Sequence, residues 1–201
     1  AVCYLFPLLA FLFLTGCQPK VYLMPSPIGI SASDRSFFQH SPGNINNNRL
    51  TTLYATNRVA NNLVPQNDSY TIFPSDNLHI GIVTHQAGDD DDNWEDFYAK
   101  SLDNERKKEI PITLNNVQEL LTLDDEAPLE TISEETEKAF KRINEIITHS
   151  ADKDITVYVH GANSSFYRAT AQGAQYFHYT GHNSVVLTFS WPSAENILKY
   201  K

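Results

Sequence analysis

Two short segments of this sequence contain residue types from which an acyl-transfer site can be built. His160-Gly161-Ala162-Asn163-Ser164 follows the apolar stretch 155–159, and Ser190-Trp191-Pro192-Ser193 ends the stretch 185–190. A glycine in a turn lets the backbone approach a substrate closely, because glycine tolerates dihedral angles that other residues avoid. The start of a following helix favours negative charge, such as the charge that develops on oxygen during acyl transfer. The first segment therefore predicts an anion-stabilising turn.

Helical and strand patterns place both segments at the carboxyl ends of strands. Ser133 is a candidate N-cap for a helix that runs to about residue 149, and apolar residues at helical spacing predict a second helix from Phe166 to about residue 180. The β-branched runs 155–159 and 185–189 are typical of buried parallel strands. The order helix, strand, helix, strand indicates an α/β fold, in which helices flank a mostly parallel sheet.

The segment before these elements contains weaker strand patterns. Residues 53–58 and 78–84 are predicted as strands, the second because apolar and polar residues alternate. Residues 110–114 are a third candidate, and Pro111 favours an edge position because proline cannot donate a backbone hydrogen bond. We expect the globular domain to span residues 50–201.

The two segments, taken together, resemble the signature of an uncharacterised bacterial family of α/β hydrolases. In that family a strand ends in His-Gly-x-Asn, a helix follows, and the next strand ends in Phe-Ser-Trp-Pro-Ser. Tyr54-Ala55-Thr56-Asn57-Arg58 is similar to the family's Ala-Thr-Asn/Asp-Arg strand, so the resemblance covers about 53–58 and 139–201. It implies an oxyanion hole and an adjacent pocket: the N–H of Ala162 is the expected donor, Gly161, His160 and Asn163 support it, and Trp191 and Ser190 line the pocket.

The nucleophile of such an enzyme is not evident in this sequence. An α/β hydrolase carries its serine in a Gly-x-Ser-x-Gly elbow, with the acid and the histidine later in the chain. No Gly-x-Ser-x-Gly occurs in the 201 residues. The resemblance therefore implies a Ser-Asp-His triad downstream of Lys201 and no cofactor, and we expect the 201 residues alone to be an inert N-terminal part of the enzyme.

Several residues also allow other interpretations. His160 could be a catalytic base, although the fold places the triad histidine last, and Ser190 or Ser193 could be a nucleophile, although both lack the elbow. Trp191 and Pro192 could fix the chain's turn after the strand instead of lining a pocket. The remaining histidines considered lack a metal-ligand spacing such as His-Glu-x-x-His and are interpreted as surface or helix-end residues: His149, His178 and His182.

The charge of the chain excludes one class of partner. The formal net charge is −9, and most acidic residues lie between Asp89 and Glu137. Such a surface repels phosphate backbones, so we expect no nucleic-acid partner. The run Asp89–Asp92 lacks the spaced ligands and turn glycine of a calcium loop and is predicted to be a solvated loop.

The N-terminal residues resemble a bacterial lipoprotein leader. Residues 2–14 are an apolar run with the length of a signal-peptide core, shorter than the ~20 residues of a membrane-spanning helix. The run ends in Leu14-Thr15-Gly16-Cys17, which resembles a lipobox. We therefore expect a signal peptide over 1–16, a lipid on Cys17 and a flexible tether over 17–49. Gln18 after the cysteine favours the outer membrane of a Gram-negative cell. The only other cysteine is Cys3, so the domain has no disulfide framework.

Three functions remain open at this point. The first is hydrolysis of an ester, thioester or amide of a small acyl substrate at the cell envelope, by a serine mechanism. The second is a non-catalytic lipoprotein that uses the same fold as a binding module, because a fold does not fix a function. The third is a purely structural lipoprotein, which would leave the turn at His160 without a purpose.

Overall fold

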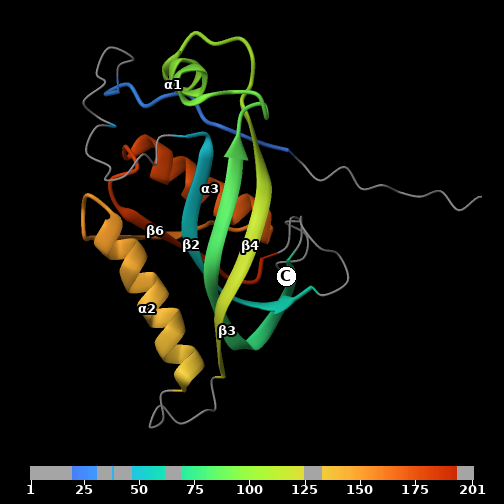
Figure 1. The fold of residues 1–201 in the computed structure, drawn as a ribbon. Coiled ribbons are helices and arrows are strands. Elements are labelled where there is room, and N and C mark those ends of the chain that lie inside the picture. The colour runs from blue at the N-terminus through green and yellow to red at the C-terminus, as the bar shows by residue number, and fades with distance from the viewer. Residues whose placement is uncertain (1–19, 31–37, 39–46, 62–68, 125–132, 194–201) are drawn as a thin grey trace, which may run out of the picture.

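A six-stranded mixed sheet with helices on both faces forms the described part of the protein (Figure 1). The computed structural model describes residues 20–30, 38, 47–61, 69–124 and 133–193. The strand order is β1-β4-β3-β2-β6-β5. The strands are β1 (Val21–Tyr22), β2 (Arg49–Ala60), β3 (Tyr70–Ala87), β4 (Pro111–Asp124), β5 (Ile155–Val159) and β6 (Val185–Ser190), and the helices are α1 (Trp94–Leu102), α2 (Glu134–His149) and α3 (Phe166–Tyr179). The predicted α/β class is confirmed.

The sheet is not mostly parallel, so that part of the prediction is wrong for the described strands. The neighbours β1–β4, β4–β3 and β3–β2 are antiparallel, and β2–β6 and β6–β5 are parallel. Antiparallel neighbours need no crossover helix, so β2, β3 and β4 follow one another as a meander. The parallel pair β5–β6 does need a crossover, which α3 supplies. Strands β3 and β4 are also longer than the predicted segments 78–84 and 110–114.

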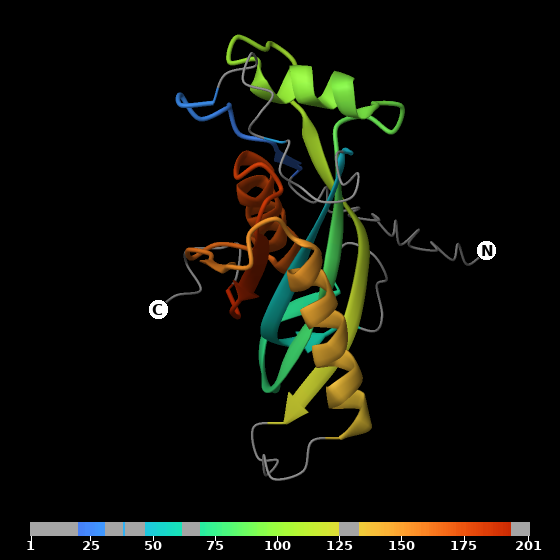
Figure 2. The ribbon, with the colours of Figure 1, turned by 60° about the vertical axis from the view of Figure 1, so that its left-hand side comes forward.

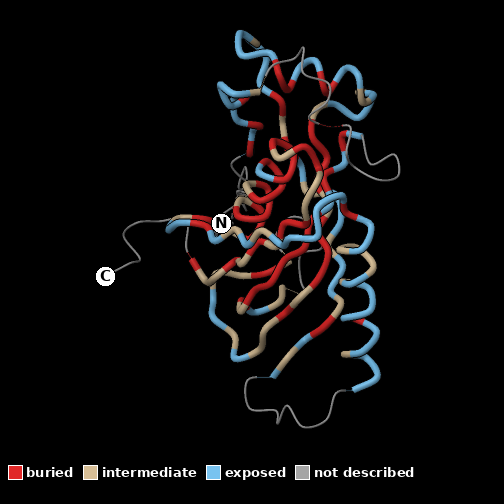
Figure 3. The backbone as a smooth tube through the Cα atoms, turned by 90° about the vertical axis from the view of Figure 1, so that its left-hand side faces the viewer, coloured by how far each residue is buried: buried red, intermediate tan, exposed pale blue. Residues whose placement is uncertain are grey.

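The two long helices cover opposite faces of the sheet (Figure 2). On one face, Phe166 of α3 packs against Tyr54 of β2 and Val83 of β3. On the other, Leu53 and Ile82 pack with the half-buried isoleucines of α2. Alternate strand residues point to opposite faces, which is why neighbours in sequence contribute to different cores. Helix α3 is mostly buried, whereas α2 has a single buried residue and lies along the sheet as an exposed rod (Figure 3).

Strand β5 lies at the edge of the described sheet, and one of its faces is uncovered. It pairs in parallel with β6, as predicted, but it is not buried. Ile155, Val157 and Val159 are 46%, 56% and 57% exposed, respectively. The β-branched composition predicts a strand and its apolar faces, but it does not reveal whether another element covers them. The prediction of a buried strand is therefore wrong for β5 and correct for β6.

The domain begins before residue 50, because residues 20–24 pack on it. Val21 of β1 pairs with Ile112 of β4, and its N–H donates to the Tyr167 hydroxyl at 3.3 Å. The N–H of Met24 donates to Gln175 Oε1 at 2.8 Å. Residues 21–24 of the predicted tether are thus attached to the sheet and to α3. The signal peptide and Cys17 lie outside the described residues, and none of the helices in the described ranges is long and apolar enough to span a membrane.

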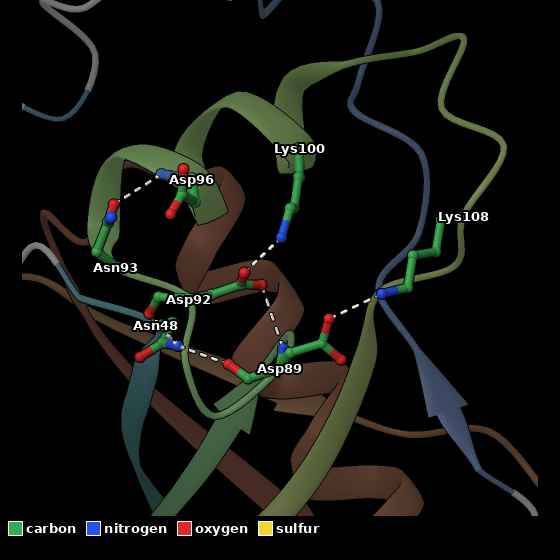
Figure 4. Close-up of polar contacts among 7 residues, drawn as sticks. All are labelled: Asn48, Asp89, Asp92, Asn93, Asp96, Lys100 and Lys108. Carbon is green, nitrogen blue, oxygen red and sulfur yellow. Dashed lines mark hydrogen bonds and ion pairs between the residues drawn. The ribbon is translucent and has the colours of Figure 1, made fainter.

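The acidic run after β3 forms an ordered turn that leads into α1, an element that the sequence analysis did not predict (Figure 4). Asp92 binds Lys100, and Asp89 binds Lys108 at 2.8 Å. Asn93 caps α1 by accepting a hydrogen bond from the Asp96 N–H at 3.0 Å. These lysines pair with two of the four acidic residues, and the other two, Asp90 and Asp91, are exposed. The run is therefore a mostly exposed loop, as predicted, but it is held by two lysines and leads into a helix.

Candidate functional site

The two segments singled out in the sequence meet at one edge of the sheet. Residues 160–165 connect the end of β5 to the start of α3, and residues 191–193 follow β6. Because β5 and β6 are parallel and Val159 lies beside Phe189, both strands end at the same level. Ser165 caps α3 by accepting a hydrogen bond from the Arg168 N–H at 3.3 Å. The 160–165 turn thus lies between the carboxyl end of β5 and the amino end of α3, where helix geometry favours an anion.

His160 is the buried anchor of this turn. Its side chain is stacked on the Trp191 indole, with ring centroids 5.1 Å apart and planes 4° from parallel. Its Nδ1 donates to the Gly161 carbonyl at 2.6 Å, which places the ring proton on Nδ1. The Trp191 Nε1–H donates to the His160 carbonyl at 2.9 Å. The other ring nitrogen, Nε2, is buried and has no hydrogen-bond partner in the described part of the chain.

Burial lowers the pKa of His160, and the positive charge of Arg58 lowers this pKa further. A hydrogen bond to the Gly161 carbonyl acts in the opposite direction but does not outweigh these effects. His160 is therefore neutral around pH 7. A neutral, buried imidazole that donates to its own turn fits a supporting role, as the resemblance implies.

The backbone of Gly161 and Ala162 is the accessible part of the turn. Both residues are exposed, and their N–H groups donate no hydrogen bond within the described ranges. A Cβ added at Gly161 would meet nothing within 4 Å. The unusual backbone conformation lies at Asn163, with a φ of 64°, and not at Gly161. Asparagine tolerates this left-handed region better than most residues do, so the glycine provides open space and not a special dihedral angle.

Arg58 of β2 joins both segments, a role that the sequence analysis missed. Its side chain is completely buried. Its Nη2 donates to the Ser164 carbonyl at 2.8 Å, its Nη1 to the Ser193 carbonyl at 3.3 Å and its Nε to the Ser190 carbonyl at 3.4 Å. The Thr56 hydroxyl donates to the same Ser190 carbonyl at 2.5 Å. The Tyr54–Arg58 motif was visible in the sequence, but nothing local indicated where its arginine would reach.

The structure places Ser190 and Ser193 inside the domain. Ser193 Oγ accepts a hydrogen bond from the Ser164 N–H at 3.1 Å and so ties the end of β6 to the turn. Ser190 is fully buried, and its Oγ has no partner among the described residues. Within the described ranges, the Ser190 hydroxyl therefore lacks the hydrogen bond to a histidine that activates a serine nucleophile. Trp191 is half-buried and holds the turn through His160, whereas Ser190 does not reach the surface.

The other three histidines named in the sequence analysis lie at helix ends. His149 is exposed at the end of α2, as predicted. His178 and His182 lie at and just after the end of α3, as the helix-end interpretation predicts, but both are buried, so the surface interpretation is wrong for them. His178 Nδ1 and His182 Nε2 are 3.1 Å apart, and the two rings pack among aromatic side chains, including Trp94 and Phe97 of α1. Because α1 was not predicted, the burial of the His178 and His182 rings against it could not be predicted either. Within the described ranges, no three metal-ligating side chains gather in one place.

Comparison with known families agrees with this geometry. Residues 135–201 match the family described as "Alpha/beta hydrolase of unknown function (DUF900)". No curated protein and no solved structure matches the chain.

The region that matches the family contains the site's two segments but not the side chains of β2 that join them. It includes α2, β5, the 160–165 turn, α3 and β6. Thr56 and Arg58 lie outside it, on β2. Because β2 pairs with β6 from Leu53 to Thr56, Thr56 reaches the end of β6, and Arg58 reaches both the end of β6 and the turn. The candidate site is therefore supported by strand β2, which the family match does not cover.

Proposed function

We propose that this α/β hydrolase is a serine acyl hydrolase, and that residues 160–165 form part of its oxyanion hole. The observation that carries the proposal is that Gly161 and Ala162 are exposed residues whose N–H groups have no partner in the described ranges. The Ala162 N–H is the donor that we assign to the oxyanion. Fixed donors of this kind contribute about 3–4 kcal/mol to acyl transfer, because they require no reorganisation when the charge develops.

The fold leaves room for a nucleophile beside this turn. Among the described strands, β5 has no neighbour on its outer side, and its apolar face is exposed. A further parallel strand at this edge would end next to residues 160–165, at the carboxyl ends of β5 and β6. We propose that the serine elbow occupies this position. The 201 residues contain no Gly-x-Ser-x-Gly, so we expect them to hydrolyse nothing without that segment.

The test uses the complete gene product and p-nitrophenyl esters of increasing acyl length. Ala162→Pro removes the assigned N–H, and Ala162→Gly keeps it as a matched control. We expect kcat to fall about 100- to 1000-fold in the proline variant and to change little in the glycine variant. Covalent labelling by a fluorophosphonate probe would identify the serine. A complete protein that neither reacts with the probe nor cleaves any ester would overturn the proposal and favour the non-catalytic binding module.

We also propose that the enzyme is held at the cell envelope by a lipid on Cys17. The support is the apolar run that ends in Leu14-Thr15-Gly16-Cys17. Two or more acyl chains anchor a protein stably, whereas one gives only marginal binding. In cells fed radiolabelled palmitate, the wild-type protein should carry label in the membrane fraction, and Cys17→Ser should carry none. Equal labelling of both would contradict lipidation at this residue.

A further inference from the structure

The completely buried guanidinium of Arg58 requires an explanation, because burying a cation is costly unless its donors are satisfied. Its described hydrogen bonds go to backbone carbonyls: those of Thr71, Ser164, Ser190 and Ser193. Hydrogen bonds from a charged donor are about twice as strong as those between neutral groups. The side chain therefore cross-links three separate segments: β3, the 160–165 turn and the end of β6.

The Ser164 carbonyl, which Arg58 binds, lies where it can fix the position of the turn. Ser164 precedes the cap residue of α3, and its carbonyl receives the shortest of the four hydrogen bonds, at 2.8 Å. The N–H of the same residue is held by Ser193 Oγ at 3.1 Å. The turn is thus fixed on one side by Ser164 and on the other by His160, through Trp191. The exposed N–H groups of Gly161 and Ala162 lie between these two attachments.

We infer that Arg58 is a positioning residue of the oxyanion turn, whose guanidinium fixes Ser164 against the end of β6 and whose charge keeps the turn favourable for an anion. The inference rests on the proposed function, because it assigns the turn to the oxyanion. Arginine suits this role better than lysine, since its rigid planar fork directs several donors at once, whereas an ammonium is a single point charge. The charge already acts at the turn, because it lowers the pKa of His160.

The two parts of the role, fork and charge, can be separated in the 201-residue chain by NMR. Arg58→Lys keeps the charge and loses the fork, and Arg58→Gln loses both. Arg142→Gln is the control, because Arg142 is exposed on α2 and contacts Glu145 at 3.2 Å. Circular dichroism selects the variants that remain folded. The readouts are amide hydrogen exchange at residues 160–165 and the pH titration of the His160 imidazole.

We expect exchange of the Ser164 amide, which Ser193 Oγ holds in the wild type, to be at least about tenfold faster in both Arg58 variants than in the wild type and in Arg142→Gln. The pKa of His160 should rise in Arg58→Gln, because a neighbouring positive charge is lost, and stay low in Arg58→Lys. If Arg58 only filled space in the core, the loss of its charge would not change the pKa of His160. In the complete enzyme, Arg58→Lys should lower kcat more than it changes KM.

Three results would overturn the inference. The first is a folded Arg58→Lys variant with wild-type exchange at residues 160–165. The second is a folded Arg58→Gln variant with an unchanged His160 pKa. The third is the loss of folding in both variants, which would make Arg58 a residue of general stability. Because these readouts need no catalysis, an inactive complete protein would end the proposed function and leave the positioning of the turn measurable by itself.

Discussion

At the scale of single residues, burial sets the protonation of the histidines inside the domain. His85, His160 and His178 are buried, and burial lowers the pKa of each. A buried imidazolium loses its hydration, so the neutral ring is favoured. These rings are consequently neutral in the folded protein under conditions where an unfolded chain would begin to bind protons.

His85 provides a test of this effect on stability. Burial lowers its pKa from 6.5 to about 3. Between these two pH values the unfolded chain binds a proton that the folded chain does not, so the free energy of unfolding falls as the pH falls. The slope for one such group approaches about 1.4 kcal/mol per pH unit. Below about pH 3 both states are protonated, and this contribution stops growing.

The variant His85→Leu should remove that slope. His85 Nε2 lies 3.2 Å from the Thr170 hydroxyl, which also donates to the Phe166 carbonyl at 2.9 Å and so keeps a partner. We expect urea unfolding near pH 8 to give similar stabilities for the two proteins. Near pH 4.5 the variant should be the more stable one. A constant difference across this pH range would show that His85 is protonated in the folded state.

At the scale of secondary-structure elements, the packing of α3 on β6 depends on one glycine. A Cβ added at Gly173 would lie 2.0 Å from Thr188 Oγ1 and 3.3 Å from Thr188 Cβ. In an exposed helix, replacing glycine by alanine stabilises by up to about 1 kcal/mol. Here the helix lies too close to the strand for that gain, because the core has no room for another methyl group.

We therefore expect Gly173→Ala to destabilise the domain by about 1–3 kcal/mol in urea titrations. Thr188→Ala removes the hydroxyl that the new methyl would meet, and this hydroxyl has no partner in the described ranges. The double variant should recover most of the loss, since the two residues are in direct contact. Additive effects would mean that the two elements can move apart without cost.

Elements whose signals are local could be predicted from the sequence, and those that depend on distant partners could not. Helix α3 and strand β6 follow from apolar periodicity and β-branching, and Ser133 caps α2 as expected. Strand β1 exists because Val21 pairs with β4, about 90 residues away in the chain. Arg58 likewise acts on Ser164, which is 106 residues away. The 160–165 turn could be located by its motif, but the contact that Arg58 makes with it could be predicted only from the register of β2 and β6.

At the scale of the whole molecule, the sheet has one well-covered face and one that is only partly covered. Helix α3 buries its side of β2, β3 and β6, whereas α2 packs with the other side away from β5. The apolar face of Ile155, Val157 and Val159 remains open. Parallel strands normally have both faces covered, because their outward residues are apolar on both sides. The exposed face is thus the part of the molecule where a further covering element is most favoured.

The effect of one substitution on stability distinguishes a covered face of β5 from an open one. Val157→Thr keeps a β-branched side chain and reduces the apolar surface of β5. In the 201-residue chain, where Val157 is 56% exposed, we expect lower binding of the dye ANS and little loss of stability. Ile28→Thr is the control, because Ile28 is fully exposed and is not part of β5. It should leave ANS binding unchanged.

In the complete protein the same Val157→Thr substitution should have the opposite consequence. If a serine-bearing strand and its helices cover β5, Val157 becomes buried, and a hydroxyl there replaces a methyl group inside a core. Burying a hydroxyl without a partner costs about 1–3 kcal/mol, so thermal unfolding should occur at a lower temperature. Ile28→Thr should again have little effect. An unchanged unfolding temperature for Val157→Thr would mean that the face stays open in the complete protein, and the nucleophile would then have to approach residues 160–165 from another direction.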